Sequence, residues 1–161
     1  MDLKTLYREI ILDHYKKPRN TTPLEAPDRE ARCKNPSCGD RVLLSLKLDG
    51  DVISGVALAG TGCAISQASA SMMTQAIKGK TVAQAEAIRQ AVRAMIVEGQ
   101  PADQQALGEL AVLEGVAKLH ARVKCAMCGF SALEAALEQR TDEVDMELDE
   151  SLPSSQRTGN I

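Results

Sequence analysis

The sequence has very few aromatic residues and no tryptophan. Only 2% of its 161 residues are aromatic, although 44% are hydrophobic. That hydrophobic content is typical of a folded chain rather than a disordered one. The core must therefore be built mainly from leucine, isoleucine, valine, alanine and methionine, and the length suits one domain of ordinary size.

Signals of several common function classes are also missing. The net charge is -3 and there is no basic stripe with interleaved aromatic residues, which argues against a nucleic-acid-binding surface. No apolar run approaches the roughly 20 residues that a membrane-spanning helix needs. The N-terminal residues are amphipathic and include acids, unlike a secretory signal or a transit peptide. We therefore expect a cytoplasmic protein that binds neither nucleic acid nor membrane.

The five cysteines are not explained by disulfide bonds. Their number is odd, there is no secretory signal, and the chain is long enough to fold without covalent cross-links. Free cysteine is among the most buried residue types, so we expect at least one of the five to be a packing residue. Metal binding or thiol chemistry becomes the leading explanation for the others.

Hydrophobic spacing predicts several helices. Apolar residues recur every three or four positions in four segments, which indicates amphipathic helices over residues 2–16, 64–77, 82–97 and 125–140. Residues 104–119 have a helical pattern that Gly108 and Gly115 interrupt, which predicts two shorter pieces.

Two segments between the first and second helices alternate as strands do. Residues 41–48 and 52–59 flank Asp49-Gly50, a strong hairpin signal. Residues 30–36 are a candidate for a third strand. We therefore expect an α+β fold with a small three-stranded antiparallel sheet and five or six helices packed mainly on one face.

The C-terminal residues lose the helical pattern. They are rich in acids and then in proline, serine, glycine and asparagine. This composition is typical of a solvated segment. We predict a folded domain over residues 1–140 and an acidic, disordered tail over residues 141–161.

Three short motifs carry the chemistry. Asn35-Pro36-Ser37-Cys38-Gly39-Asp40 puts a thiol and a carboxylate two residues apart, and two more thiols follow in Gly60-Thr61-Gly62-Cys63-Ala64 and Arg122-Val123-Lys124-Cys125-Ala126. Zinc takes four ligands from thiolates, imidazoles and carboxylates. The motifs are far apart in the sequence, so their spacing alone is a weak sign of a metal site.

The surroundings of the three thiols favour a ligand or nucleophile over a packing role. Glycines beside Cys38 and Cys63 let the backbone approach a bound group. Cys63 and Cys125 each precede a predicted helix, whose N-terminus favours a thiolate. The positive charges of Arg122 and Lys124 act on Cys125 in the same direction. Buried structural cysteines are the alternative.

Cys33 and Cys128 allow a different metal site. Cys33 forms a C-x4-C pair with Cys38, and Cys128 forms a C-x2-C pair with Cys125. These four thiols could hold a purely structural zinc. That site would leave Cys63 unexplained and would give Asp40 no role. We favour a buried packing role for Cys128.

Together the three cysteine motifs resemble those of the SufU branch of the IscU-like (NifU N-terminal-like) family of iron–sulfur cluster biogenesis proteins. The opening also matches, in Tyr7, Ile10-Ile11, Asp13-His14-Tyr15 and Pro18-Arg19-Asn20, so the resemblance covers roughly residues 3–138. The IscU branch has a histidine directly before its third cysteine. This chain has Lys124 there, as the SufU branch does.

The resemblance implies an IscU-like α+β fold, a metal site and a function. It implies a tetrahedral zinc held by Cys38, Asp40, Cys63 and Cys125. The protein would be a zinc-dependent sulfurtransferase that docks on a SufS-type cysteine desulfurase. Cys38 would accept the persulfide sulfur, which would then pass to a SufBCD-type scaffold. Arg122 could steady the thiolate or the persulfide, and either Cys38 or Asp40 could be the zinc ligand that exchanges.

Two further functions stay open at this point. The same three cysteines could assemble an iron–sulfur cluster from iron and sulfur and transfer it to acceptor proteins. Alternatively, the zinc could be structural and the surface could act as an adaptor.

Overall fold

The computed structural model describes residues 2–148. The rest of the predicted tail, residues 149–161, lies outside the described residues. The helices and strands are, in chain order, α1 (Leu3–Lys16), β1 (Arg29–Asn35), β2 (Asp40–Asp49), β3 (Val52–Thr61), α2 (Ala64–Ile77), α3 (Val82–Ile96), α4 (Gln104–Leu107), the 3-10 helix η1 (Gly108–Lys118), α5 (His120–Leu137) and β4 (Val144–Asp145).

The predicted α+β class is confirmed, with one strand more than expected. The sheet has four strands in the order β3-β2-β1-β4. The neighbours β1–β2 and β2–β3 are antiparallel, as predicted, whereas β4 runs parallel to β1. β4 has only two residues, too few for an alternating pattern to be visible in the sequence.

The hairpin between β2 and β3 sets which face of the sheet is buried. Gly50 adopts a left-handed φ of 64° at the turn, which glycine tolerates without strain. Val42, Leu44 and Leu46 alternate along β2 and are buried in the core, whereas Arg41 is exposed. Leu44 and Leu46 therefore lie on the buried face of the sheet.

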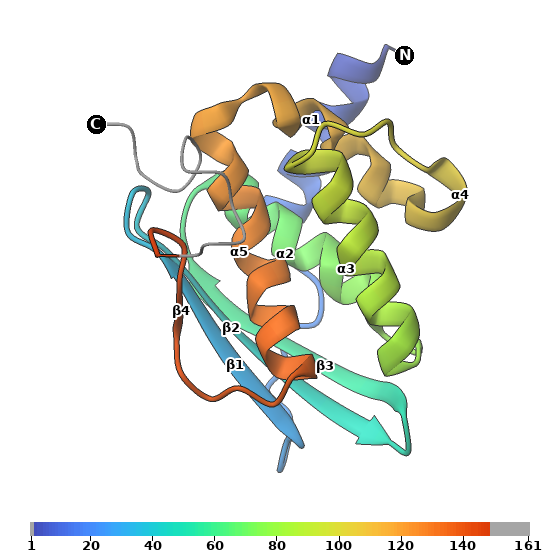
Figure 1. Cartoon of the computed structure of the whole chain (residues 1–161), viewed down its shortest axis with the longest axis vertical. Helices are drawn as coiled ribbons and strands as arrows, with labels where there is room; N and C mark the ends of the chain where they lie inside the picture. Colours follow the sequence, from blue (N-terminus) through green and yellow to red (C-terminus); the bar gives the residue numbers. More distant parts are fainter. Residues whose placement is uncertain (1, 149–161) are drawn as a thin grey trace.

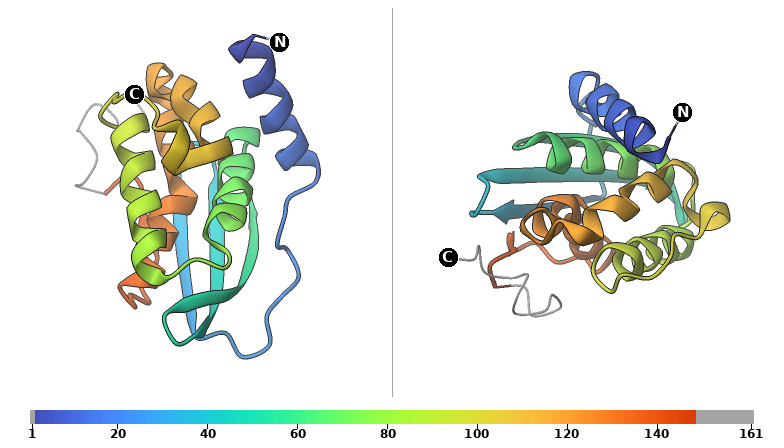
Figure 2. Two further views of the ribbon diagram at one scale, coloured as in Figure 1. Left: turned by 90° about the vertical axis from the view of Figure 1, so that its right-hand side faces the viewer. Right: turned by 90° about the horizontal axis from the view of Figure 1, so that it is seen from above.

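The helices form a layer against this buried face of the sheet. α5 packs against β1 and β2, and α2 packs against β3 and against α5. α1 then packs on α2, and α3 packs on α5 and η1, so these two helices lie at the outer sides of the helical layer (Figures 1 and 2). The prediction that the helices pack mainly on one face is confirmed.

Two helix predictions need correction. The break expected at Gly108 separates α4 from η1, but Gly115 lies inside η1 and does not divide it. α5 begins at His120 rather than after Cys125. Cys125 therefore lies in the second turn of a helix, and the predicted effect of a helix N-terminus does not apply to it. The earlier start was not predicted because the N-cap residue, Leu119, forms no side-chain cap, so no capping signal in the sequence marks the beginning of the helix.

The first part of the predicted tail belongs to the folded domain. Val144 and Asp145 pair with Cys33 and Lys34 of β1, and Met146 is fully buried. The folded part therefore extends beyond the predicted boundary at residue 140. Within residues 2–148, no helix combines the length and the apolar character needed to cross a membrane.

Gly129 sets the distance between α5 and α2. A Cβ atom at this position would lie 2.9 Å from the Cβ atom and 3.0 Å from the Cα atom of Ala70. We predict that Gly129→Ala lowers the free energy of unfolding by about 1–3 kcal/mol, because the helices must move apart. Chemical denaturation measures this difference.

Gly115→Ala is the matched control for that measurement. A Cβ atom there would approach only the Tyr7 ring, at 3.9 Å, so little or no loss of stability is expected. Equal effects of the two substitutions would contradict the close packing of α2 and α5.

Candidate metal centre

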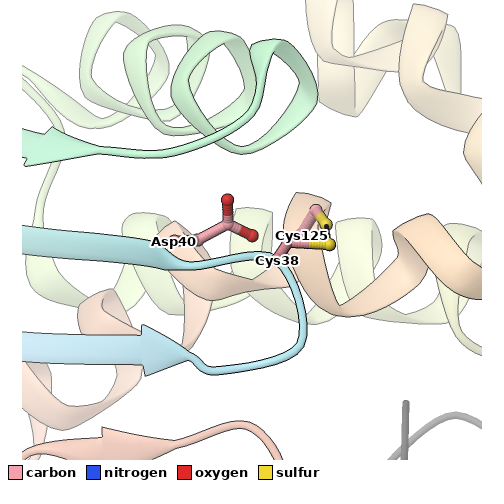
Figure 3. Close-up of side chains that lie close together, drawn as sticks. All are labelled: Cys38, Asp40 and Cys125. Carbon is pink, nitrogen blue, oxygen red and sulfur yellow. Dashed lines mark hydrogen bonds between the residues drawn. The ribbon is translucent and has the colours of Figure 1, made fainter. Parts of the chain in front are cut away.

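The predicted ligands come from four separate elements. Cys38 lies in the turn between β1 and β2, and Asp40 is the first residue of β2. Cys63 is the N-cap of α2, and Cys125 lies in α5. The ligand atoms of Cys38, Asp40 and Cys125 all lie within 4.8 Å of one another (Figure 3). The Sγ atoms of Cys38 and Cys125 are 3.2 Å apart.

Cys63 lies beside this group rather than within it. Its backbone N–H donates to Asp40 Oδ1 at 2.9 Å, and its sulfur accepts a hydrogen bond from Ser66 N–H at 3.4 Å. Interaction with the Cys125 side chain is also the main cause that lowers the pKa of Cys63, whereas the Cys125 thiol donates to the Cys38 sulfur at 3.2 Å. The structure thus brings three of the four predicted ligands together directly and places the fourth in contact with two of them.

The carboxylate of Asp40 is buried and both of its oxygens accept hydrogen bonds. Its exposed fraction is 1%. Oδ1 accepts from Cys63 N–H, and Oδ2 accepts from the Asn35 side-chain amide at 3.0 Å. The Asn35 amide also lies 3.5 Å from Cys125 Sγ. Sequence reasoning missed Asn35, although it opens the first cysteine motif, because asparagine in a turn is usually explained by the backbone alone.

Gly62 leaves the space that this arrangement needs. A Cβ atom at Gly62 would lie 2.4 Å from Asp40 Oδ1 and 2.8 Å from Ser66 Oγ. Its φ of 152° is also one that other residues rarely adopt. The glycine in the second motif is therefore required for Asp40 to reach the start of α2.

The pKa values of the Cys63 and Cys125 thiols are shifted in opposite directions. Interaction with the Cys125 side chain, helped by Ser66 N–H, lowers the pKa of Cys63 to about 6. The same interaction and burial raise the pKa of Cys125 well above its ordinary range. Of the two thiols, Cys63 is therefore the one that ionises first.

Cys38 is the accessible sulfur of the group formed with Asp40 and Cys125. It is half-buried, whereas those two residues are buried. The guanidinium of Arg122 lies at the surface, with Nη1 3.6 Å from Cys38 Sγ. The hydrogen bond to Cys125 and the negative charge of the sulfurs raise the pKa of Arg122, so it stays a cation.

Lys124 is paired with the carboxylate of Glu147, whereas we expected its charge to act on Cys125. Its side chain is only 2% exposed, and Nζ lies 2.8 Å from Glu147 Oε1 and 2.9 Å from Ser37 Oγ. Its charge is therefore balanced by Glu147 rather than by the Cys125 sulfur.

The other two cysteines are packing residues. Cys33 and Cys128 are fully buried in the hydrophobic core. Within residues 2–148, neither belongs to a group of metal-ligating side chains. The structure therefore gives no support to the alternative C-x4-C and C-x2-C zinc site, and it agrees with the packing role favoured for Cys128.

The donor set suits zinc. Thiolates and a carboxylate are ligands that zinc accepts in tetrahedral sites. Two thiolates on one tetrahedral zinc lie about 3.8 Å apart, for Zn–S bonds of about 2.3 Å. The Sγ atoms of Cys38 and Cys125 would have to separate only slightly from their 3.2 Å to reach this distance.

Comparisons with known proteins identify the family. The sequence model of the family described as the NifU-like N-terminal domain matches residues 6–126. The chain belongs to this family. It is 46% identical over 133 residues to the zinc-dependent sulfurtransferase SufU of Bacillus subtilis, which covers 83% of this chain and 90% of that protein. The predicted resemblance to the SufU branch is confirmed.

Scaffold proteins of the same family are also similar. The iron–sulfur cluster assembly scaffold protein IscU of Streptococcus pyogenes is 38% identical over 137 residues, which cover 85% of this chain and 86% of that protein. This relative is named for iron–sulfur cluster assembly, whereas the relative in Bacillus subtilis is named for sulfur transfer.

Solved structures of the family have the same fold. A protein described as an iron–sulfur cluster assembly scaffold for the SUF system of Fervidobacterium islandicum superposes with a TM-score of 0.77 at 36% identity, over 83% of this chain and 97% of that one. The N-terminal part of a NifU-like protein of Brucella abortus gives 0.77 at 26% identity, over 86% and 96%.

The opposite pKa shifts of Cys63 and Cys125 predict how thiolate formation depends on pH. In metal-free protein, the first thiolate should form with a pKa of about 6, at Cys63. Because interaction with the Cys125 side chain is the main cause of the low value, Cys125→Ala should raise this pKa toward the ordinary thiol range of about 8.5. The ultraviolet absorbance of thiolate during a pH titration measures both values.

Cys33→Ala is the control, since Cys33 is buried in the core and does not belong to the group of metal-ligating side chains. It should leave the first titration unchanged. If wild-type protein forms no thiolate until about pH 8, as isolated thiols do, the Cys63–Cys125 hydrogen bond is absent.

Proposed function

We propose that this protein is a zinc-dependent sulfurtransferase that accepts persulfide sulfur from a SufS-type cysteine desulfurase for iron–sulfur cluster assembly. The observation that carries the proposal is an accessible thiol, Cys38, at a site whose Asp40 and Cys125 are buried. The relative in Bacillus subtilis is itself named a zinc-dependent sulfurtransferase.

The metal ligands in this proposal are Cys38, Asp40, Cys63 and Cys125. A bound zinc ion deprotonates its cysteine ligands and so supplies thiolates at neutral pH. The hydrogen bonds from Cys63 N–H and Asn35 hold Asp40 in place whether or not Cys38 moves. We therefore assign the exchange to Cys38 rather than to Asp40.

The transfer step balances without an oxidant or a reductant. The Cys38 thiolate attacks the outer sulfur of the persulfide on the desulfurase. A new sulfur–sulfur bond forms to Cys38, and the bond to the desulfurase cysteine breaks. The electron pair leaves with that cysteine as a thiolate, so one thiolate is consumed and one is produced.

Arg122 stabilises the negative charge during this exchange. Its guanidinium lies at the surface and 3.6 Å from Cys38 Sγ, so it can follow a sulfur that turns toward a partner. A cation beside a thiolate favours the charged form. The sulfur carried on Cys38 would then pass to a SufBCD-type scaffold.

Assembly of an iron–sulfur cluster on the same cysteines is the second candidate. The observation that favours it is the similarity to proteins named as IscU scaffolds. It would be supported by stoichiometric iron and sulfide in anaerobically purified protein and by transfer of a cluster to an apo-acceptor.

The decisive test is stimulation of a SufS-type desulfurase. Zinc-loaded wild-type protein should increase the rate of sulfide or alanine release from cysteine. Cys38→Ala should lower this stimulation to background, roughly 100-fold or more, because the acceptor nucleophile is gone. Asp40→Ala should lower both zinc content and stimulation, because it removes a ligand.

Cys128→Ala serves as the control, because this cysteine lies in the core. It should keep the zinc and the stimulation. No stimulation by the wild type would exclude the sulfurtransferase. Stimulation that survives Cys38→Ala would instead favour an adaptor whose zinc is structural.

A further inference from the structure

We propose that Glu147 is a positioning residue that holds the loop of Cys38 closed against α5, through Lys124 and Ser37. The inference rests on the proposed function, in which Cys38 is the sulfur acceptor. Glu147 lies beyond residues 6–126, the part of the chain that matches the family model.

The segment after α5 is built to bring Glu147 to this place. β4 pairs with β1 at Cys33 and Lys34, and Met146 N–H donates to the Lys34 carbonyl at 2.9 Å. The Met146 side chain is fully buried. Glu147 N–H then donates to Asp145 Oδ1 at 2.9 Å. Backbone pairing and a buried anchor thus fix the chain directly before the carboxylate.

Three side chains meet there. Glu147 Oε1 accepts a hydrogen bond from Lys124 Nζ at 2.8 Å and another from the Ser37 hydroxyl. Lys124 Nζ also donates to Ser37 Oγ at 2.9 Å. Ser37 directly precedes Cys38, and Lys124 directly precedes Cys125. The cluster therefore ties the residue before one sulfur to the residue before the other.

Burial fixes the Lys124 end of this cluster, whereas Ser37 is exposed. Lys124 is 2% exposed, and a buried ammonium group is stable only while it keeps its ionic and hydrogen-bond partners. Glu147 supplies the negative charge, so Lys124 stays fixed on α5. Ser37 is the member that lies on the turn of Cys38. Movement of Cys38 toward a partner must break the hydrogen bonds of Ser37. The strength of these bonds therefore determines how readily the Cys38 thiol becomes exposed.

The test measures the exposure of Cys38 without any partner protein. Cys38 is alkylated with iodoacetamide in metal-free and in zinc-loaded full-length protein, and its rate is followed by peptide mass spectrometry. Glu147→Gln should speed this reaction about tenfold in both forms, which is the effect expected from loss of a charge-assisted hydrogen bond. Ser37→Ala should act in the same direction while keeping the Lys124–Glu147 pair.

Glu143→Gln is the matched control. It makes the same change in the same segment, but Glu143 faces Lys34 and Arg41 at 3.7–3.9 Å instead of the cluster. Its Cys38 rate should equal that of the wild type. A Glu147→Gln rate within about twofold of the Glu143→Gln rate would overturn the proposal, since a charge-assisted bond has a larger effect.

A double variant separates this role from general destabilisation. Glu147→Gln alone removes the carboxylate that pairs with the buried Lys124 and should destabilise the fold, whereas Lys124→Met with Glu147→Gln removes both charges of the pair. The double variant should regain stability in chemical denaturation but should keep the fast reaction of Cys38. If the Cys38 rate instead returns to the wild-type value together with the stability, Glu147 has only a structural role.

The outcome is independent of the desulfurase test. Loss of Cys38 protection in Glu147→Gln can be observed even if the wild type fails to stimulate a desulfurase, which would overturn the sulfurtransferase alone. Normal stimulation by the wild type with an unchanged Cys38 rate in the variant would overturn the role of Glu147 alone.

Discussion

The buried carboxylate of Asp40 is the interaction on which the centre depends. A charge at 1% exposure is costly unless its oxygens are paired. The Cys63 N–H and the Asn35 amide pair them, and these groups lie at the start of α2 and the end of β1. Asp40 therefore fixes the positions of two strand ends and one helix start, and Gly62 is the residue that leaves room for it.

This fixed carboxylate contrasts with the thiol two residues before it. Cys38 lies in the turn between β1 and β2, next to a surface arginine. Its N–H donates to the Asn35 carbonyl at 3.2 Å, and Ser37 beside it makes side-chain contacts with Lys124 and Glu147. A site that binds a metal and also transfers sulfur needs ligands of both kinds. The physical difference between Asp40 and Cys38 is the reason that we propose Cys38 as the exchanging ligand, an identity that the sequence left open.

Local signals in the sequence predicted most of the fold. α2 and α3 were placed to within one residue, because both have regular apolar spacing. In the structure Thr81 and Gln84 also form a capping box at the start of α3. The three cysteine motifs indicated the site. Contacts between distant segments could not be predicted in the same way. Ser37 and Glu147 are 110 residues apart, and β4 is too short to leave a pattern. The environment of Lys124 was misjudged for this reason.

X-ray absorption at the zinc edge of the zinc-loaded protein tests the central claim most directly. A site formed by Cys38, Asp40, Cys63 and Cys125 should give a first shell of three sulfur atoms and one oxygen atom, at about 2.3 Å and 2.0–2.2 Å. Asp40→Ala should change the oxygen contribution and leave the sulfur contribution. A first shell of four sulfur atoms, unchanged in Asp40→Ala, would contradict the account and would favour a site that includes Cys33 or Cys128.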